Sequence, residues 1–297
     1  MDFLSTELRP PRAASDDALL RLAAEAGASG IHCGAGCDLS LVDALARAGA
    51  RLGLEVGSLT APLPERPLPR GRRLPRLAAT ERDERAAAIA LAEKALTIGA
   101  GAGARRFVVD FGGVALESVR PESLWRAFAR REMDDDESGA TLLAAALAER
   151  RARGGDITDA CLWALERLVR LAEPLGLGLV LPVGATPWEV PTPREAGELA
   201  ETFAGAVGHA WDPGRLSVLA ALGLPISDDR LKALAKGAVL SIENDAVGID
   251  AGYLPGLGER DPRLAAFASA AGTARVIRGG ADATDEEVAA AVAALGR

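Results

Sequence analysis

Short apolar runs of strand length alternate with longer amphipathic segments along this chain. In the longer segments apolar residues recur at helical spacing, for example Leu19, Leu22 and Ala26. Strands that alternate with helices are typical of a parallel sheet covered by helices, and eight such units close into a barrel. The predicted strands are residues 2–8, 30–34, 52–59, 106–111, 178–183, 207–211, 238–243 and 274–278. The pattern therefore predicts an α/β fold, a single (β/α)8 TIM barrel.

A doubly wound open sheet is the rival arrangement of alternating strands and helices. That arrangement commonly carries a glycine-rich phosphate-binding turn between a strand and the following helix. Here the glycine-rich stretch 99–103 follows a helix and precedes a strand, which is the wrong order and favours the barrel. The predicted helices are residues 15–27, 38–48, 81–98, 157–174, 195–204, 216–222, 228–235, 262–271 and 285–295.

The regular alternation is interrupted between residues 114 and 155. This segment carries two further predicted helices, 121–131 and 141–153, and the acidic run 134–137. The acidic run lacks the alternating ligands and the glycine of a calcium loop, so a solvated loop is favoured over a divalent-ion site. We expect one barrel domain over residues 1–297, with 114–155 as an inserted lid or side subdomain that is more mobile than the barrel.

Composition and charge exclude several classes of function. The formal net charge is −8 with 26% charged residues, whereas affinity for nucleic acid depends mainly on a positive field. The three cysteines, Cys33, Cys37 and Cys161, form no CxxC pair and argue against a disulfide framework or a structural zinc site. No apolar run reaches 18 residues and the N-terminus does not resemble a signal peptide. We expect a soluble, cytoplasmic protein that binds neither nucleic acid nor membrane.

A carboxylate stands at the end of the predicted strand 207–211. Asp212 follows this strand directly, and a Pro-Gly turn and a new helix come next. The C-terminal ends of barrel strands form the mouth in which substrates bind, so Asp212 is a candidate catalytic residue. Ala210 shares a face with Asp212 and His209 faces the opposite side, because successive strand residues alternate. The structural alternative is that Asp212 caps the following helix.

A second strand end, 241–245, also carries acidic residues. Glu243 together with Asp212 could form an acid–base pair for proton transfer next to a carbonyl group. The structural alternative is an ion pair between Glu243 and either Arg278 or Arg215. Both interpretations remain open from the sequence.

Other candidates stand near the predicted mouth. Asp110 ends a strand before two glycines, where it could face the mouth or cap a helix. His32 lies on the second strand and is either buried or catalytic. Trp188 lies in a proline-rich loop after a strand, where an aromatic ring could cover a sugar-like ring. The proline- and arginine-rich segment 62–76 is expected to be a loop over or beside the mouth.

Several phrases of the sequence resemble one family in their order along the chain. Residues 18–31 resemble the helix-to-strand opening of the xylose-isomerase-like TIM barrels, the sugar-phosphate isomerase/epimerase superfamily. Residues 54–62 and 103–109 are similar to later strands of that family, and 212–215 resembles its Asp-x-x-His motif. The resemblance spans most of the chain outside 114–155. It implies a divalent metal that polarises substrate oxygens while carboxylates move a proton through an enediolate.

The positions at which the resemblance implies metal ligands are filled differently here. Asp212 is kept, but arginine stands at two positions, and arginine stays protonated and cannot coordinate a cation. The two arginines are Arg215, in place of the motif histidine, and Arg278. The other positions read Pro182 and either Ser241 or Ile242, and the two earlier histidines fall on Thr60 and Asp110. We therefore predict no bound divalent metal and no other cofactor.

Two functional hypotheses of different class follow. The first is an isomerase or epimerase of a small hydroxy-carbonyl compound, such as a sugar or sugar phosphate, that works without the usual metal. Asp212 and Glu243 would move protons, Arg215 and Arg278 would bind an anionic group, and Thr60, Asp110 and Trp188 would complete the substrate site. The second is an inactive barrel that binds a ligand or a partner protein. The expected partners are a small molecule and, in a homodimer, a second copy of the chain.

Overall fold

A closed barrel of eight parallel strands forms the centre of the computed structural model, which describes residues 1–7, 15–69, 72–129, 137–270, 274–279 and 283–295. The strands are β1 (Asp2–Ser5), β2 (Gly30–Cys33), β3 (Glu55–Ala61), β4 (Arg106–Val109), β5 (Gly178–Leu181), β6 (Val207–Trp211), β7 (Ala238–Glu243) and β10 (Arg275–Ile277). They pair in the order β1-β10-β7-β6-β5-β4-β3-β2, and β1 closes the ring against β2. The predicted single (β/α)8 barrel is confirmed.

The barrel interior is filled by apolar side chains from several strands. Phe3, Val180 and Leu240 belong to one buried cluster inside the ring. Gly57 on β3 makes room for the largest of them, because a Cβ at this position would lie 2.2 Å from the ring of Phe3. Such layers of inward-facing side chains are typical of TIM barrels, whose centre is a packed core and not a pore.

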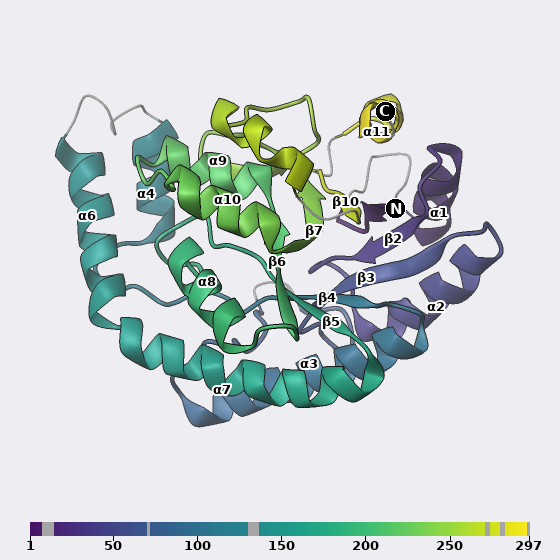
Figure 1. Cartoon of the computed structure of the whole chain (residues 1–297), viewed down its shortest axis with the longest axis horizontal. Coiled ribbons are helices and arrows are strands. Elements are labelled where there is room, and N and C mark those ends of the chain that lie inside the picture. The colour runs from purple at the N-terminus through teal and green to yellow at the C-terminus, as the bar shows by residue number, and fades with distance from the viewer. Residues whose placement is uncertain (8–14, 70–71, 130–136, 271–273, 280–282, 296–297) are drawn as a thin grey trace.

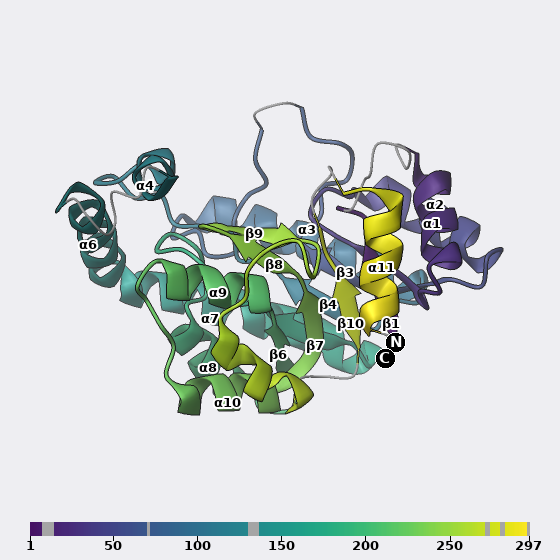
Figure 2. The same cartoon turned by 90° about the horizontal axis from the view of Figure 1, so that it is seen from above.

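Helices surround the barrel, as Figures 1 and 2 show. Many of them begin at a residue whose side chain caps the free backbone amides, as the sequence signals indicate. Ser15 and Asp38 cap the first two helices, and Thr192 forms a capping box with Glu195. The surrounding helices are α1 (Asp16–Glu25), α2 (Leu39–Ala50), α3 (Arg82–Gly101), α7 (Gly154–Ala172), α8 (Pro193–Thr202), α9 (Pro213–Ala221), α10 (Asp228–Lys236) and α11 (Asp285–Leu295).

The region after β7 differs from the sequence-based expectation. Residues 245–253 form an antiparallel hairpin of β8 (Asp245–Val247) and β9 (Asp250–Tyr253), which packs on α9. The helix expected at 262–271 is replaced by two short 3-10 turns, η3 (Pro262–Ala266) and η4 (Ala268–Ala270), and residue 271 lies outside the described residues. The hairpin depends on contacts with α9, and hydrophobic periodicity along the chain does not reveal such contacts.

Two helices, α4 (Pro121–Ala129) and α6 (Glu137–Ala152), lie together at one end of the molecule, away from the barrel strands (Figures 1 and 2). A buried cluster that includes Leu124, Leu143, Val218 and Ala246 joins them to α9 and the hairpin. The role of 114–155 as a lid stays a prediction, and residues 134–136 of the acidic run lie outside the described residues.

Among the helices that the structure describes, none combines the length and the apolar character needed to cross a bilayer. The expected cytoplasmic location and the expected homodimer stay predictions.

Candidate functional site

A cavity of about 370 Å³ opens at the C-terminal ends of the barrel strands, and we call it the mouth cavity. All five residues that we expected to bind substrate line it, because the ends of parallel strands converge at one rim of the barrel. They are Thr60, Asp110, Trp188, Arg215 and Arg278. The cavity also contains His32, Arg73, Glu189 and, unexpectedly, Glu7.

Arg215 is held on one side of the mouth cavity by several acceptors. Its Nη1 donates to the backbone oxygen of Val183 at 3.1 Å and to Glu189 Oε1 at 3.3 Å, and its Nε lies 3.5 Å from Asp212 Oδ2. Glu189 is anchored in turn by the backbone amides of residues 185 and 186. Burial lowers the pKa of Arg215, but the neighbouring carboxylates outweigh it and raise this pKa above its ordinary value. The guanidinium therefore stays charged.

Arg278 forms the corresponding pair on β10's side of the mouth. Its Nε lies 2.7 Å from Glu7 Oε2, and Glu7 Oε1 accepts a hydrogen bond from the amide of Ala35 at 3.0 Å. The sequence placed Glu7 inside the first strand and gave it no role. That strand ends at Ser5, so Glu7 lies in the turn beyond it, where side chains face the mouth.

The two carboxylates, Glu7 and Glu189, approach the mouth cavity from opposite sides of the barrel. Glu7 follows β1 and Glu189 follows β5, and these strands are four places apart in a closed ring of eight. Each carboxylate is paired with a guanidinium, Arg278 or Arg215. A ligand in the cavity would therefore lie between two carboxylate–guanidinium pairs.

His32 lies in the wall of the mouth cavity and is almost fully buried. Its Nδ1 is 2.9 Å from Ser58 Oγ, and its Nε2 is 3.3 Å from Thr60 Oγ1. The pKa of His32 is lowered to about 4, mainly by burial; Glu7 raises this pKa in part, and Arg278 lowers it. The imidazole is therefore neutral near pH 7, and it orients the Thr60 hydroxyl at the cavity.

Asp212 occupies a different place from the one we expected. Its side chain is fully buried and is not among the residues that line the mouth cavity. Its Oδ1 accepts a hydrogen bond from the Arg215 amide at 3.0 Å and caps α9, so the capping alternative is the arrangement that the structure shows. Burial raises the pKa of Asp212 above its ordinary value, although Arg215 and Arg278 lower it in part.

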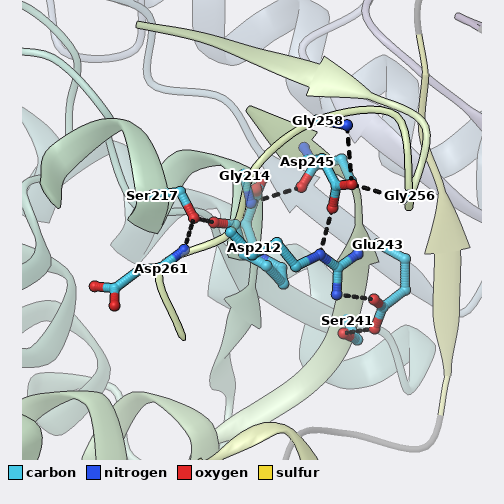
Figure 3. A network of polar contacts seen from close by, with 12 residues as sticks. Asp212, Gly214, Ser217, Ser241, Glu243, Asp245, Gly256, Gly258 and Asp261 are labelled. Atoms are coloured by element: carbon cyan, nitrogen blue, oxygen red, sulfur yellow. Dashed lines mark hydrogen bonds and ion pairs between the residues drawn. The ribbon is translucent and has the colours of Figure 1, made fainter. Parts of the chain in front are cut away.

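Glu243 also has a partner that the sequence did not indicate. It accepts a hydrogen bond from Ser241 Oγ at 2.7 Å and lies 3.3 Å from Arg260 Nη1. Arg260 also binds Asp245, and Figure 3 shows this network next to Asp212. The structural alternative, an ion pair of Glu243 with Arg278 or Arg215, is not what the described residues show, because the chain after β9 returns and places Arg260 beside Glu243. Glu243 is likewise not among the residues that line the mouth cavity.

Four of the positions at which the resemblance implies metal ligands carry groups that do not fit a divalent ion. Pro182, Arg215, Ile242 and Arg278 all line the mouth cavity, and none of them offers an oxygen or imidazole donor from its side chain. Within the described part of the chain, no group of three or more His, Cys, Asp or Glu side chains could hold a metal. Two guanidinium groups would instead repel a cation.

No protein-family model matches this sequence, and no curated protein matches it either. Solved structures do match over nearly its whole length. E. coli 3-keto-D-glucoside 4-epimerase shares 14% identity at a TM-score of 0.62, over 99% of this chain and 97% of its own. A D-psicose 3-epimerase shares 12% identity at a TM-score of 0.65, over 98% of this chain and 96% of its own. The IOLI protein, solved with a bound zinc atom, shares 17% identity at a TM-score of 0.64, over 99% of this chain and 95% of its own.

At these identities the similarity establishes the fold and not the activity. It agrees with the order of motifs along the sequence and with the closed ring of eight parallel strands. The protein therefore has the TIM-barrel fold of these solved structures.

Proposed function

We propose that the protein is an isomerase or epimerase of a small, sugar-like hydroxy-carbonyl compound and that it works without the usual divalent metal. One observation supports this most directly: Arg215 and Arg278 line the mouth cavity at positions where the resembled family is expected to hold metal ligands. A guanidinium can do part of what a metal does, because it stabilises negative charge that develops on a substrate oxygen.

The proposed reaction moves a proton on a carbon next to a carbonyl group. Glu7 and Glu189 lie in the cavity on opposite sides, so one can remove the proton and the other can return one. Arg215 and Arg278 would hold the enediolate oxygens or an anionic group of the substrate. A ligand oxygen bound to one of these guanidinium groups would compete with the carboxylate paired to it, so binding would weaken the ion pair and free the carboxylate to contact the substrate.

The acid–base role that the sequence suggested for Asp212 and Glu243 requires contact with the ligand, and neither residue lines the cavity. In our proposal both are positioning residues. The Asp212 carboxylate contacts both the backbone amide and the guanidinium of Arg215, and Glu243 contacts Arg260. Thr60, Asp110 and Trp188 remain the proposed ligand-contacting residues.

The test is solvent exchange in D2O with a panel of ketoses and ketose phosphates, followed by mass spectrometry. Deuterium should enter the carbon next to the carbonyl of at least one compound. Glu7→Gln and Glu189→Gln should each slow this exchange by about a hundredfold or more, since general acid–base catalysis contributes on that order. Arg105→Gln, an exposed change outside the mouth cavity, is the matched control and should exchange at the wild-type rate.

A barrel that binds a ligand without catalysis is the second candidate. It is favoured by the pairing of Glu7 and Glu189 with arginine, which neutralises the two groups proposed to transfer protons. The same panel separates the two functions. Saturable binding of a compound that shows no exchange would contradict the isomerase proposal and support the binding function.

A further inference from the structure

A second cavity of about 970 Å³ adjoins the mouth cavity, and we call it the outer cavity. It lies between the loop after β3 and the segment that leads from β4 to α4. Arg73, Asp110, Gly112, Gly113 and Trp188 line both cavities, so the two spaces are neighbours across a shared wall. The mouth cavity is near the lower end of the size range of ligand pockets, about 300–1,000 Å³. The outer cavity therefore adds room for a second ligand unit.

The shared wall is held by backbone pairing between two loops. Gly113 pairs with Glu189 in an antiparallel bridge, and the amide of Val114 donates to the backbone oxygen of Trp188 at 2.7 Å. This pairing joins the loop after β4 to the loop after β5. It fixes Trp188 between the two cavities.

Arg76 fixes the other side of the outer cavity. Its Nε and Nη2 bind the two carboxylate oxygens of Glu84 at 2.8 and 3.0 Å, and its Nη1 donates to the Gly113 oxygen at 3.0 Å. The side chain packs against Gly112, where a Cβ would lie 2.7 Å from Arg76 Cγ. This wall is therefore built from specific, mutually dependent contacts.

The charge of the outer cavity favours a neutral, hydroxyl-rich ligand. Arg76 is neutralised by Glu84, and Glu122 adds a carboxylate, so the cavity offers no excess of positive charge to a phosphate. At the junction, Asp110 Oδ1 accepts a hydrogen bond from the Gly112 amide at 2.8 Å, and neither Asp110 nor Arg73 forms an ion pair with another of the described residues. They can therefore bind hydroxyl groups, while the half-buried ring of Trp188 can cover the apolar face of a sugar.

We infer that the outer cavity is a second sugar subsite, and that the ligand is a glycoside or disaccharide whose reacting unit occupies the mouth cavity. This inference rests on the proposed function. It assigns the anion-binding guanidinium groups to the reacting unit and the neutral outer cavity to the second sugar. Trp188, Asp110 and Arg73 then contact the glycosidic junction.

Isothermal titration with a panel of disaccharides and their component monosaccharides tests the inference. At least one disaccharide should bind ten times more tightly than either of its components. Ala115 is exposed and lines only the outer cavity of the two. Ala115→Trp should place an indole ring in part of that space and remove the tenfold advantage without changing monosaccharide binding. Ala115→Ser is the matched control and should retain it, and thermal melts verify that both variants fold.

The outcomes separate this inference from the proposed function. Monosaccharide binding as tight as that of every disaccharide would overturn the second subsite and leave the isomerase proposal intact. A loss of disaccharide and monosaccharide binding by the same factor in Ala115→Trp would also overturn it, because the outer cavity would then not be a separate subsite. Failure of every sugar to bind would overturn the proposed function, and this inference with it.

Discussion

His32 couples the stability of the barrel to pH. Its ring is buried against Ser58 and Thr60, and the pKa of His32 in the folded protein is about 4, below its ordinary value of 6.5. The unfolded chain therefore binds a proton between pH 6.5 and 4 that the folded chain does not bind. Folding stability must decrease as pH falls through this window.

We predict that this proton alone costs the wild-type protein about 3 kcal/mol of unfolding free energy by pH 4, following the 2.5-unit shift. Urea unfolding of the wild type and of His32→Gln at pH 7, 5.5 and 4.5 measures it. The variant should lose less stability than the wild type over this range. The only other histidine, His209, also has a pKa lowered by burial, and it contributes to the pH dependence of both proteins. Equal slopes for the two proteins would refute the assignment to His32.

At the scale of elements, the chain between β7 and η3 is fastened to α9 by side-chain hydrogen bonds (Figure 3). Asn244 Oδ1 accepts from the Gly214 amide at 2.9 Å, and the Asp261 amide donates to Ser217 Oγ at 2.8 Å. A Cβ on Gly214 would lie only 2.7 Å from Asn244 Oδ1. The first turn of α9 and the strand end after β7 therefore depend on each other.

Asp245 is the centre of this fastening. Its Oδ2 accepts from the amides of Gly256 and Gly258 at 2.6 and 3.2 Å, and its Oδ1 binds Arg260. We predict that Asp245→Ala destabilises the protein by about 2–3 kcal/mol, because it leaves the amide donors of Gly256 and Gly258 without their acceptor, whereas Arg260 keeps Glu243 as a partner. Arg260 is partly exposed, so the ion pair itself adds little of this.

Hydrogen exchange gives the direct measurement for Asp245→Ala. The amides of Gly256 and Gly258 should exchange faster than in the wild type, while those of β1–β6 should not change. Asp250→Ala, an exposed change on the same hairpin, is the control and should alter neither stability nor exchange. Unchanged protection at 256–258 in Asp245→Ala would show that other contacts hold this loop.

At the scale of the whole molecule, the barrel mouth balances its charges without a metal. Three cationic and three anionic side chains line the mouth cavity, and they are Arg73, Arg215, Arg278, Glu7, Asp110 and Glu189. A divalent cation placed among them would approach two guanidinium groups, at a cost of about several kcal/mol at an intermediate dielectric constant.

We therefore predict that the purified protein contains no stoichiometric divalent ion and that its melting temperature is indifferent to EDTA. Elemental analysis and melts with and without the chelator measure this. Asp212 is the single retained donor at the implied ligand positions, so Asp212→Ala is the informative variant. About one zinc, manganese or magnesium per chain, lost in Asp212→Ala, would restore metal-dependent isomerase chemistry as the leading hypothesis.

The sequence by itself determined the barrel and the place of its mouth. Buried parallel strands are near-continuous apolar runs, and each is followed by an amphipathic helix, so the order of elements can be read locally. The convergence of Thr60, Asp110, Trp188, Arg215 and Arg278 on one cavity follows from the same logic, since every parallel strand ends at the same rim.

Tertiary structure decided which way the acidic side chains face. Asp212 stands at the predicted strand end, yet its carboxylate caps α9 and is buried beside Arg215. Glu243 is paired with Arg260, which the hairpin brings back from beyond β9, and Glu7 reaches the mouth because its strand ends early. Alternation along a strand assigns a residue to one face of the sheet. The side chain that pairs with this residue can come from a loop that is distant in sequence, as Arg260 does for Glu243. Only the closed fold places that loop.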